Sequence, residues 1–278
     1  MRPGTNGSRG IALLAVVVSA LSGARAAPAP AELDALWALW RAHEAAPTNH
    51  PPLARAAADF VRRFSTSELC AVARGLGAWH ALRAGATNDA VALWTALLAA
   101  DATPLERAGQ AIARAWLTRL DREAVRVALR EHYARHALFP PTLQPLRELP
   151  AERRPPLTDR FGDAWQYSLD GYRHVPGTRG HRYRLISPRL GEELSDLRAA
   201  LARPYGGGRT PPRPLRRIGS AVQFELGSDR PAVTEGASIG PWRLALVTDR
   251  VLVLADTDYW WLLAAPGATA PPPGESRP

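Results

Sequence analysis

The sequence predicts an α+β protein with three successive parts: a helical N-terminal domain, a long helix followed by a small antiparallel sheet, and a small all-β, barrel-like module at the C-terminal end. Three observations predict this class. Apolar residues recur at helical spacing through most of residues 31–137. Large apolar and polar residues then alternate in two short runs, "AWQYSLDG" and "HRYRLIS". Finally, short β-type segments separated by turns fill residues 218–266.

Residues 1–26 are typical of a secretory signal peptide. Arg2 and Arg9 precede an apolar run over residues 11–21, and Ala24-Arg25-Ala26 fits the small-x-small pattern of a cleavage site. We expect cleavage after Ala26 and a periplasmic or secreted protein, with the formal net charge lowered from +9 to +6. The alternative is an inner-membrane anchor, but the apolar run is shorter than the ~20 residues that span a bilayer.

The distribution of charge argues against a nucleic-acid-binding protein, and the cysteine count rules out an internal disulfide. All 35 lysine and arginine positions are arginine, and they are spread along the chain, whereas a nucleic-acid-binding stripe would cluster them. We therefore expect no nucleic-acid partner. Cys70 is the single cysteine, so no internal disulfide can form. Its apolar neighbours, among them Leu69 and Val72, predict a buried small side chain.

Residues 31–118 are expected to form a compact helical domain. The first helix, over 31–46, carries an apolar stripe at spacings of three and four, and two prolines at positions 51 and 52 break the chain after it. A second helix is predicted from a capping box at Ser65 and Glu68 to a stop at Gly85. A third is predicted over 88–100, and a fourth begins at Thr103, with Pro104 at its first helical position. The helices resemble the paired units of a helical-repeat array, but no fixed period is present.

Residues 119–202 are expected to combine the next helix with two strands joined by a glycine-containing loop. Residues 203–217, rich in proline, glycine and arginine, are the predicted linker. A small β module over 218–266 and a disordered tail over 267–278 complete the chain.

Candidate catalytic and metal-binding patterns are weak. His132 and His136 are four apart on a predicted helix, but the glutamate of the His-Glu-x-x-His motif is displaced, and no third ligand is evident. Ser187, Asp196 and a histidine could be combined into a hydrolase triad, but no Gly-x-Ser-x-Gly elbow is present. We therefore expect no enzyme, no catalytic residue and no small-molecule substrate.

Three aspartates, Asp159, Asp163 and Asp170, lie near a predicted strand turn and could contact calcium. Their spacing is not that of an EF-hand loop, so turn-forming side chains are the preferred interpretation. We expect no cofactor and no metal, with calcium as the alternative.

The order of segments over residues 120–200 resembles the C-terminal region of the major pseudopilin of the type II secretion system. The resemblance rests on "LREHYARHALFPPTLQPLREL", "PPLTDRFGDAWQYSLDG" and "HRYRLISPRLG". It implies a long helix, a proline-threonine-leucine turn, an aspartate-glycine loop and two strands. Arg160 and Phe161 replace the family's Pro-Trp, while Asp159 and Gly162 keep their positions.

Two departures limit what the resemblance implies. Gly10 precedes an apolar run, but Ala15 stands where a prepilin leader would have glutamate, so assembly into a pilus core is not expected. The family's calcium loop is rich in Gly and Asp, whereas "SPRLGEELSDLRAAL" has only Glu192, Glu193 and Asp196.

Residues 215–265 are similar to the periplasmic homology-region domain of the type II secretion clamp protein and to the pilus-assembly lipoprotein P. The similarity rests on "VTEGASIGPWRLALVTDRVLVLAD". It implies a small barrel whose exposed strand edge could recruit a protein by strand addition.

Together these patterns predict a non-catalytic accessory or scaffold protein of a type II secretion or type IV pilus-like system, with protein partners and possible inner-membrane proximity. The alternative is a helical-repeat binding module unrelated to secretion. Packing is the expected role of the large aromatic residues, and an interaction surface at the tryptophan pair is the second interpretation. The structural or interaction residues are Asp159, Phe161, Gly162, Trp165, Tyr167, Tyr183, Trp242, Trp260 and Trp261.

Overall fold

The computed structural model describes residues 27–99, 103–169 and 182–268, and it has the predicted α+β class with an all-β C-terminal module. The expected signal peptide, the loop between the two predicted strands and most of the expected tail lie outside the described residues. The helices are α1 (Pro30–Ala45), α2 (His50–Arg63), α3 (Cys70–Arg83), α4 (Thr87–Leu98), α5 (Pro104–His136), α6 (Gly191–Ser195) and α7 (Leu197–Ala202), with short 3-10 helices η1 (Gln144–Glu148), η2 (Ala151–Arg153) and η3 (Tyr205–Gly208).

The strands form three antiparallel sheets. They are β1 (Gln166–Leu169) with β2 (Tyr183–Ile186), then β3 (Arg213–Ile218), β4 (Ala221–Glu225) and β5 (Ala232–Thr234), and finally β6 (Ser238–Ile239), β7 (Trp242–Val247), β8 (Val251–Ala255) and β9 (Trp260–Ala264). The C-terminal module therefore consists of a three-stranded and a four-stranded sheet, whereas the sequence predicted a barrel-like form. All residues of β8 are buried.

Local sequence signals explain where the helices begin, with two corrections. Thr103 and Glu106 form a capping box at the start of α5. The box predicted at Ser65 and Glu68 does not open α3, which begins at Cys70 after an uncapped Leu69. The prolines at 51 and 52 do not break the chain either, because they occupy the first turn of α2, where a missing N–H costs nothing.

Helix α5 is continuous across the boundary predicted between residues 118 and 119. Its sequence contains no proline after position 104, and the only glycine, Gly109, lies against Leu97 and Trp260. The helix ends at His136, where Ala137 takes a left-handed conformation with φ of 57°. Helix α5 therefore belongs both to the predicted helical domain, 31–118, and to the predicted helix-and-sheet part, 119–202.

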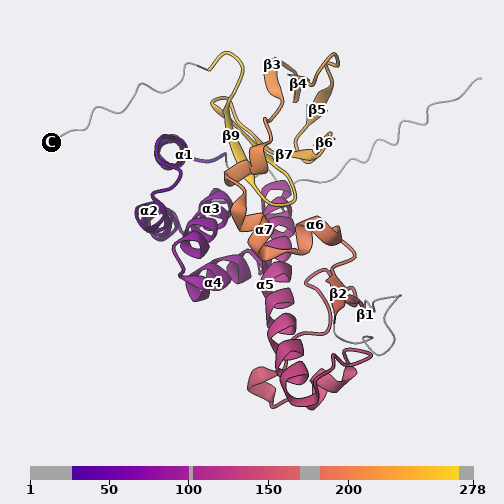
Figure 1. The fold of residues 1–278 in the computed structure, drawn as a ribbon. Helices are drawn as coiled ribbons and strands as arrows, with labels where there is room; N and C mark the ends of the chain where they lie inside the picture. The colour runs from indigo at the N-terminus through magenta and orange to yellow at the C-terminus, as the bar shows by residue number, and fades with distance from the viewer. Residues whose placement is uncertain (1–26, 100–102, 170–181, 269–278) are drawn as a thin grey trace, which may run out of the picture.

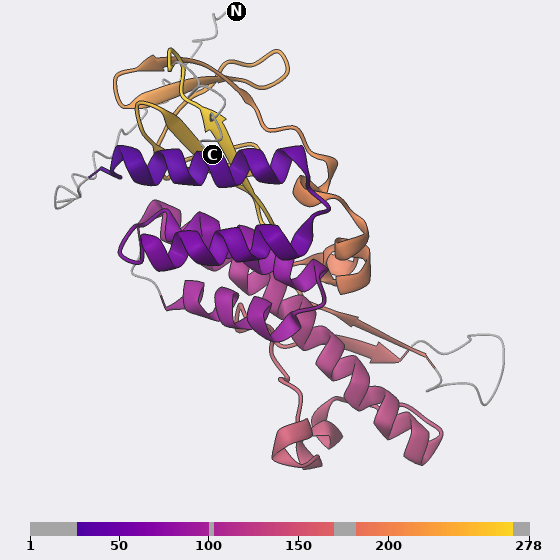
Figure 2. The ribbon, with the colours of Figure 1, turned by 90° about the vertical axis from the view of Figure 1, so that its left-hand side faces the viewer.

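The helical domain and the β module share one hydrophobic core (Figures 1 and 2). Buried residues of α1 to α5 and of β4 and β6 to β9 belong to a single cluster. Inside it, the rings of Trp94 and Trp116 stack with centroids 5.5 Å apart, and Trp260 lies against Gly75 of α3. Segments 31–118 and 218–266 thus form one body.

The predicted linker, 203–217, contains η3 and most of β3. The Tyr205 ring enters an aromatic cluster, 5.1 Å from Trp79 and 4.9 Å from Tyr259 by ring centroids. Gly206 and Gly207 have φ of 78° and 61°, which glycine adopts without strain. The glycines therefore form a defined turn here, whereas the composition of the segment indicated a flexible linker. This segment fastens the β module to the helices.

The C-terminal half of α5 extends away from the body and carries η1, η2, β1 and β2 (Figures 1 and 2). We call residues 120–190 the arm, of which 170–181 lie outside the described residues. A second core cluster fills it: Val125, Ala128, Leu129, Leu146, Leu149, Trp165 and Leu185. Within the described part of the chain, no helix has the length and apolar character needed to cross a membrane.

Candidate functional site

The aspartate of the predicted loop is the centre of a buried turn. Asp159 is 4% exposed, and its Oδ1 accepts hydrogen bonds from the backbone N–H groups of Phe161 (2.9 Å) and Asp163 (3.0 Å). Gly162 completes the turn with φ of 93°, a conformation that disfavours other residues. The Asp159 carboxylate therefore accepts the hydrogen bonds that two backbone N–H groups would otherwise make to water, and so it shapes the loop.

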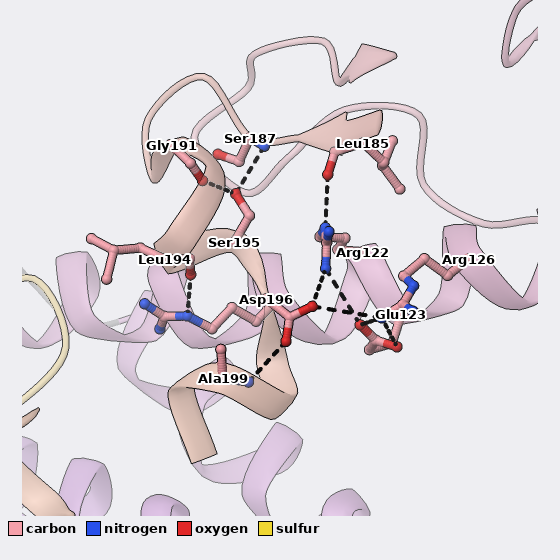
Figure 3. Close-up of polar contacts among 11 residues, drawn as sticks. Arg122, Glu123, Arg126, Leu185, Ser187, Gly191, Leu194, Ser195, Asp196 and Ala199 are labelled. Atoms are coloured by element: carbon pink, nitrogen blue, oxygen red, sulfur yellow. Dashed lines mark hydrogen bonds and ion pairs between the residues drawn. The ribbon is translucent and has the colours of Figure 1, made fainter. Parts of the chain in front are cut away.

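The second oxygen of this carboxylate connects the loop to the far end of the sheet. Ser187, directly after β2, donates its hydroxyl to Asp159 Oδ2 at 2.6 Å. The N–H of Ser187 donates in turn to Ser195 Oγ (3.0 Å), and that hydroxyl donates to Gly191 O (2.5 Å). This row of polar groups joins the Asp159 turn to α6, and Figure 3 shows its part from Ser187 through Ser195 to Gly191.

Arg160 attaches the same turn to α5. Its backbone N–H donates to Thr118 Oγ1 at 3.1 Å, and its guanidinium forms an ion pair with Asp121. Burial raises the pKa of Asp121, and the hydrogen bond and charge of Arg160 oppose that rise. Arg160 thus holds the loop on the helix.

Three arginines of α5, spaced by three and four residues, project toward the chain that follows β2. Arg119 Nε donates to Leu194 O (2.6 Å) and Arg122 Nε donates to Leu185 O (2.8 Å). Arg126 pairs with Glu123 at 2.9 Å. Figure 3 shows Arg122 reaching from the helix to the β2 backbone. Arg119 thus satisfies a backbone carbonyl of α6, and Arg122 satisfies one of β2.

Asp196 is the acidic partner of this row. It caps α7 by accepting the Ala199 N–H at 2.8 Å, and it pairs with Arg122 at 3.0 Å (Figure 3). Burial would raise the pKa of Asp196, but the Ala199 N–H, Arg122 and Arg126 outweigh that effect and lower its pKa below the usual value. Asp196 therefore stays ionised and holds α7 against α5.

A shallow groove of about 430 Å³ lies between α5 and β2. Its lining combines positive charge with aromatic surface: Arg122, Arg126, Phe139, Arg182, Tyr183, Arg184, Leu185, Ile186, Glu192 and Asp196. Such a mixture suits contact with protein, since arginine and tyrosine are enriched at interfaces.

No family model, curated protein or solved structure matches the chain.

The predicted site residues fall into two groups that lie in different parts of the molecule. In the arm, Trp165 is buried and donates from Nε1 to Pro156 O (3.0 Å), and the Tyr167 hydroxyl donates to Pro140 O (2.7 Å). Tyr167 and Tyr183 cover the second core cluster. Phe161 is half-buried and outside that cluster, so its backbone, rather than the ring expected in the sheet core, contributes to the turn.

The second group lies in the body. Trp242, Trp260 and Trp261 are 8%, 0% and 7% exposed, and all belong to the shared core. The tryptophan pair therefore packs inside the protein, as the preferred interpretation held, and does not form a surface. Cys70 is buried as well, and its thiol donates to Phe64 O at 3.0 Å.

The weak metal and triad patterns do not come together. The described residues contain no group of three or more His, Cys, Asp or Glu side chains placed to hold a metal ion. His132 and His136 contact each other on α5, with ring centroids 4.3 Å apart. Ser187 bonds to Asp159, whereas Asp196 bonds to Arg122. Asp170, the third residue of the possible calcium cluster, lies outside the described residues.

Sequence reasoning missed the arginines of α5, and it missed Asp258, the partner of Arg119. Arg119 is fully buried, pairs with Asp258 at 2.7 Å, and lies with its guanidinium carbon 4.6 Å from the Trp116 ring centroid. Trp116 Nε1 donates to Asp258 O (2.9 Å). The spacing of arginines along one helix face was a usable signal, but arginine is so frequent in this chain that the pattern did not stand out.

Proposed function

We propose that the protein is a non-catalytic accessory or scaffold component of an exported assembly of the type II secretion or type IV pilus-like kind. Its partners are proteins, and it works near the inner membrane without nucleic acid or a small-molecule substrate. The support comes from the sequence resemblance over residues 120–200 together with the use of the side chains in that region. Asp159, Ser187 and Asp196 hold turns and helix ends, which is a structural use of polar groups.

The observation that carries the proposal is the arm. Its helix, aspartate turn and two strands share a core of their own, and they extend from the body on one long helix. Among the described residues, the large hydrophobic side chains with the greatest exposure are Val127 (50%), Leu138 (45%) and Ile218 (45%). The first two belong to the arm. Exposed apolar residues on a projecting element favour a protein contact there.

The alternative, a helical binding module unrelated to secretion, would place the contact on the outer faces of α1 to α4. The shared core argues against an independent helical module, because removing the β strands would expose the faces of α3 and α5 against which Trp260 packs at Gly75 and Gly109. The alternative is therefore tested with variants of the full chain and not with an isolated helical fragment.

The test uses the bacterium from which the chain comes. Its gene is deleted and restored with the full chain carrying Val127→Asp or Leu138→Asp, and the cargo released into the medium is measured. A photo-crosslinker at position 127 then reports whether a pseudopilin or clamp subunit lies within reach. We expect both variants to reduce release and the crosslink to form.

Two matched controls add the same charge elsewhere. Ile218→Asp lies on β3, and Ala58→Asp lies on the exposed face of α2. Loss of release in Ala58→Asp alone would place the contact on the helical face and not on the arm, whereas normal release in all variants and in the deletion strain would favour the alternative unrelated to secretion. Normal release in the deletion strain, with no crosslink to a secretion subunit, would reject the secretion assignment.

A further inference from the structure

Three histidines from three consecutive helices form a chain of ring contacts. His43 lies near the end of α1, His50 is the first residue of α2, and His80 lies in α3. His43 Nδ1 and His80 Nε2 are 3.0 Å apart, and His80 Nδ1 and His50 Nδ1 are also 3.0 Å apart. At the outer end, Arg83 Nε donates to His50 Nε2 at 3.5 Å.

Counting protons shows that only one arrangement satisfies all three contacts. Three neutral imidazoles have three N–H groups and three lone pairs. Because Arg83 can only donate, His50 must accept at Nε2 and carry its proton on Nδ1. That proton faces His80 Nδ1, which must accept, so His80 carries its proton on Nε2 and donates to His43 Nδ1. Every contact therefore uses one lone pair, and none is left over.

The same count predicts the effect of one added proton. A protonated ring has no lone pair, so two lone pairs would remain for three contacts. Moving the extra proton along the chain does not help, since reversing the inner bonds places an N–H of His50 against Arg83. Wherever the proton resides, at least one contact is replaced by two opposed donors.

The geometry does not favour a shared metal ion. The two contacts of His80 use its two different ring nitrogens, so the three imidazoles do not converge on one point.

Burial and neighbouring charge keep the chain neutral. His80 is fully buried and His43 is 5% exposed. Burial, followed by the charge of His50, lowers the pKa of His43 to about 4. Burial, followed by the charges of His43, His50 and Arg83, lowers the pKa of His80 to about 3. The pKa of His50 is lowered by burial and by Arg83.

Other ionisable groups adjoin the chain on the packed elements. Glu44 of α1 is exposed and accepts from Trp40 Nε1 at 2.8 Å, and Tyr205 of η3 lies with its ring centroid 4.6 Å from that of His43. Burial raises the pKa of Tyr205, so it stays protonated at neutral and acidic pH. Among the groups on these elements, the three histidines change charge in mild acid. Asp256, which pairs with Arg209 in the segment 197–209, changes charge there as well, and comparing wild type with a histidine variant separates the two effects.

The chain is attached to the segment that fastens the β module. Arg83 Nη1 donates to Leu201 O at the end of α7, and the Tyr205 hydroxyl accepts from the N–H of Trp260 at 3.1 Å. Arg83 therefore contacts both His50 and the end of α7, and Tyr205 contacts both the His43 ring and the backbone of β9.

We propose that the His50–His80–His43 chain is a proton-sensitive joint that holds residues 197–209 on the helices at neutral pH and releases them when one proton is added. This joint goes beyond the proposed function and does not depend on it. In mild acid such a joint would loosen the link between the helices and the β module.

The experiment is hydrogen exchange of the full chain between pH 7.5 and 4, corrected for the intrinsic rate at each pH and followed by peptide. We expect residues 197–209 to lose protection below about pH 6, approaching tenfold per pH unit for an opening linked to one proton. Peptides from α5 in the arm serve as the internal reference. Nitrogen NMR of the imidazoles should show His50 with its proton on Nδ1 and His80 with its proton on Nε2.

The decisive variant is His50→Gln, because a glutamine amide can donate and accept but does not titrate. We expect normal protection of residues 197–209 at pH 7.5 and a shift of the opening to lower pH. His136→Gln, at the exposed end of α5, should leave the wild-type profile unchanged. Identical profiles for wild type and His50→Gln, or unchanged protection of 197–209 down to pH 4, would overturn the proposal. The opposite tautomer at His50 would overturn it as well.

Discussion

Trp260 lies against the backbone of Gly75 so closely that a Cβ at position 75 would be 2.4 Å from the indole Nε1. The first residue belongs to β9 and the second to α3, so this contact joins the last strand to the helical domain. Glycine in a helix interior costs stability relative to alanine. Here it is needed because the fully buried indole occupies the space of a side chain.

We therefore expect Gly75→Ala to destabilise the protein by about 1 to 3 kcal/mol through overpacking, even though alanine improves helix propensity by about 1 kcal/mol. Urea unfolding of the full chain, followed by circular dichroism, measures the change. In a Trp260→Phe background the smaller ring leaves room, so the same substitution should cost clearly less. An equal cost in both backgrounds would show that the contact does not limit position 75.

The ion pair of Arg119 and Asp258 gives a second prediction. Arg119 is fully buried, and the side chain of Asp258 is 10% exposed. Removing one partner leaves an uncompensated charge, so Asp258→Asn or Arg119→Met should each cost about 3 to 5 kcal/mol. The double variant should cost less than the sum of the single ones, as measured by a double-mutant cycle of unfolding free energies. A control is Asp249→Asn, whose pair with Arg217 is exposed and should be worth less than about 1 kcal/mol.

Most elements with local signals were predicted correctly, apart from the capping box at Ser65 and Glu68 and the proline break at 51 and 52. The other failures lie where the determining contacts are distant. The stripe of α1, the stop at Gly85 and the two alternating strands are set by neighbouring residues, and all appear in the structure. The continuity of α5 was missed because an irregular apolar pattern resembles a helix boundary. The linker prediction for 203–217 failed because the aromatic contacts of Tyr205 join residues far apart in the chain.

The same reason explains the outcome for the candidate site. Asp159 and Gly162 were recognisable as turn residues, since aspartate and glycine in this order favour a turn. The partners of Asp159 were not predictable, because Ser187 follows it by 28 positions. The histidine chain was likewise invisible, since its members are 30 and 37 positions apart and no short motif joins them.

The Asp159 turn gives the third prediction. Asp159→Ala leaves two buried backbone N–H groups and the Ser187 hydroxyl without their acceptor, so it should destabilise the protein by about 1 to 3 kcal/mol or more. Calorimetric unfolding measures the loss. Asp163→Ala is the matched control: its pair with Arg189 is exposed, and the change should stay within about 0.5 kcal/mol. If the two variants were equally stable, the carboxylate of Asp159 would not organise the loop.

Asp256 provides a pH prediction with a sign opposite to that of the histidines. The residue is 8% exposed, and burial raises its pKa to about 6 from 3.8, although the N–H groups of Asp258 and Tyr259 and the charge of Arg209 oppose the rise. The folded state therefore binds more protons than the unfolded state between about pH 4 and 6. Its contribution to stability is present at low pH and is lost as the pH rises through that window.

The variant Asp256→Asn keeps an oxygen that can accept from Asp258 and Tyr259 but cannot ionise. We expect the variant to keep its stability as the pH rises through this window. The unfolding free energy of wild type minus that of the variant should therefore fall by about 2 to 3 kcal/mol between pH 4 and 7. Guanidinium unfolding of both proteins at each pH measures the difference and cancels the histidine contribution, because the three rings are the same in both. A difference that rises with pH would mean that the Arg209 ion pair, 2.9 Å long, outweighs burial and that the carboxylate is stabilised in its charged form.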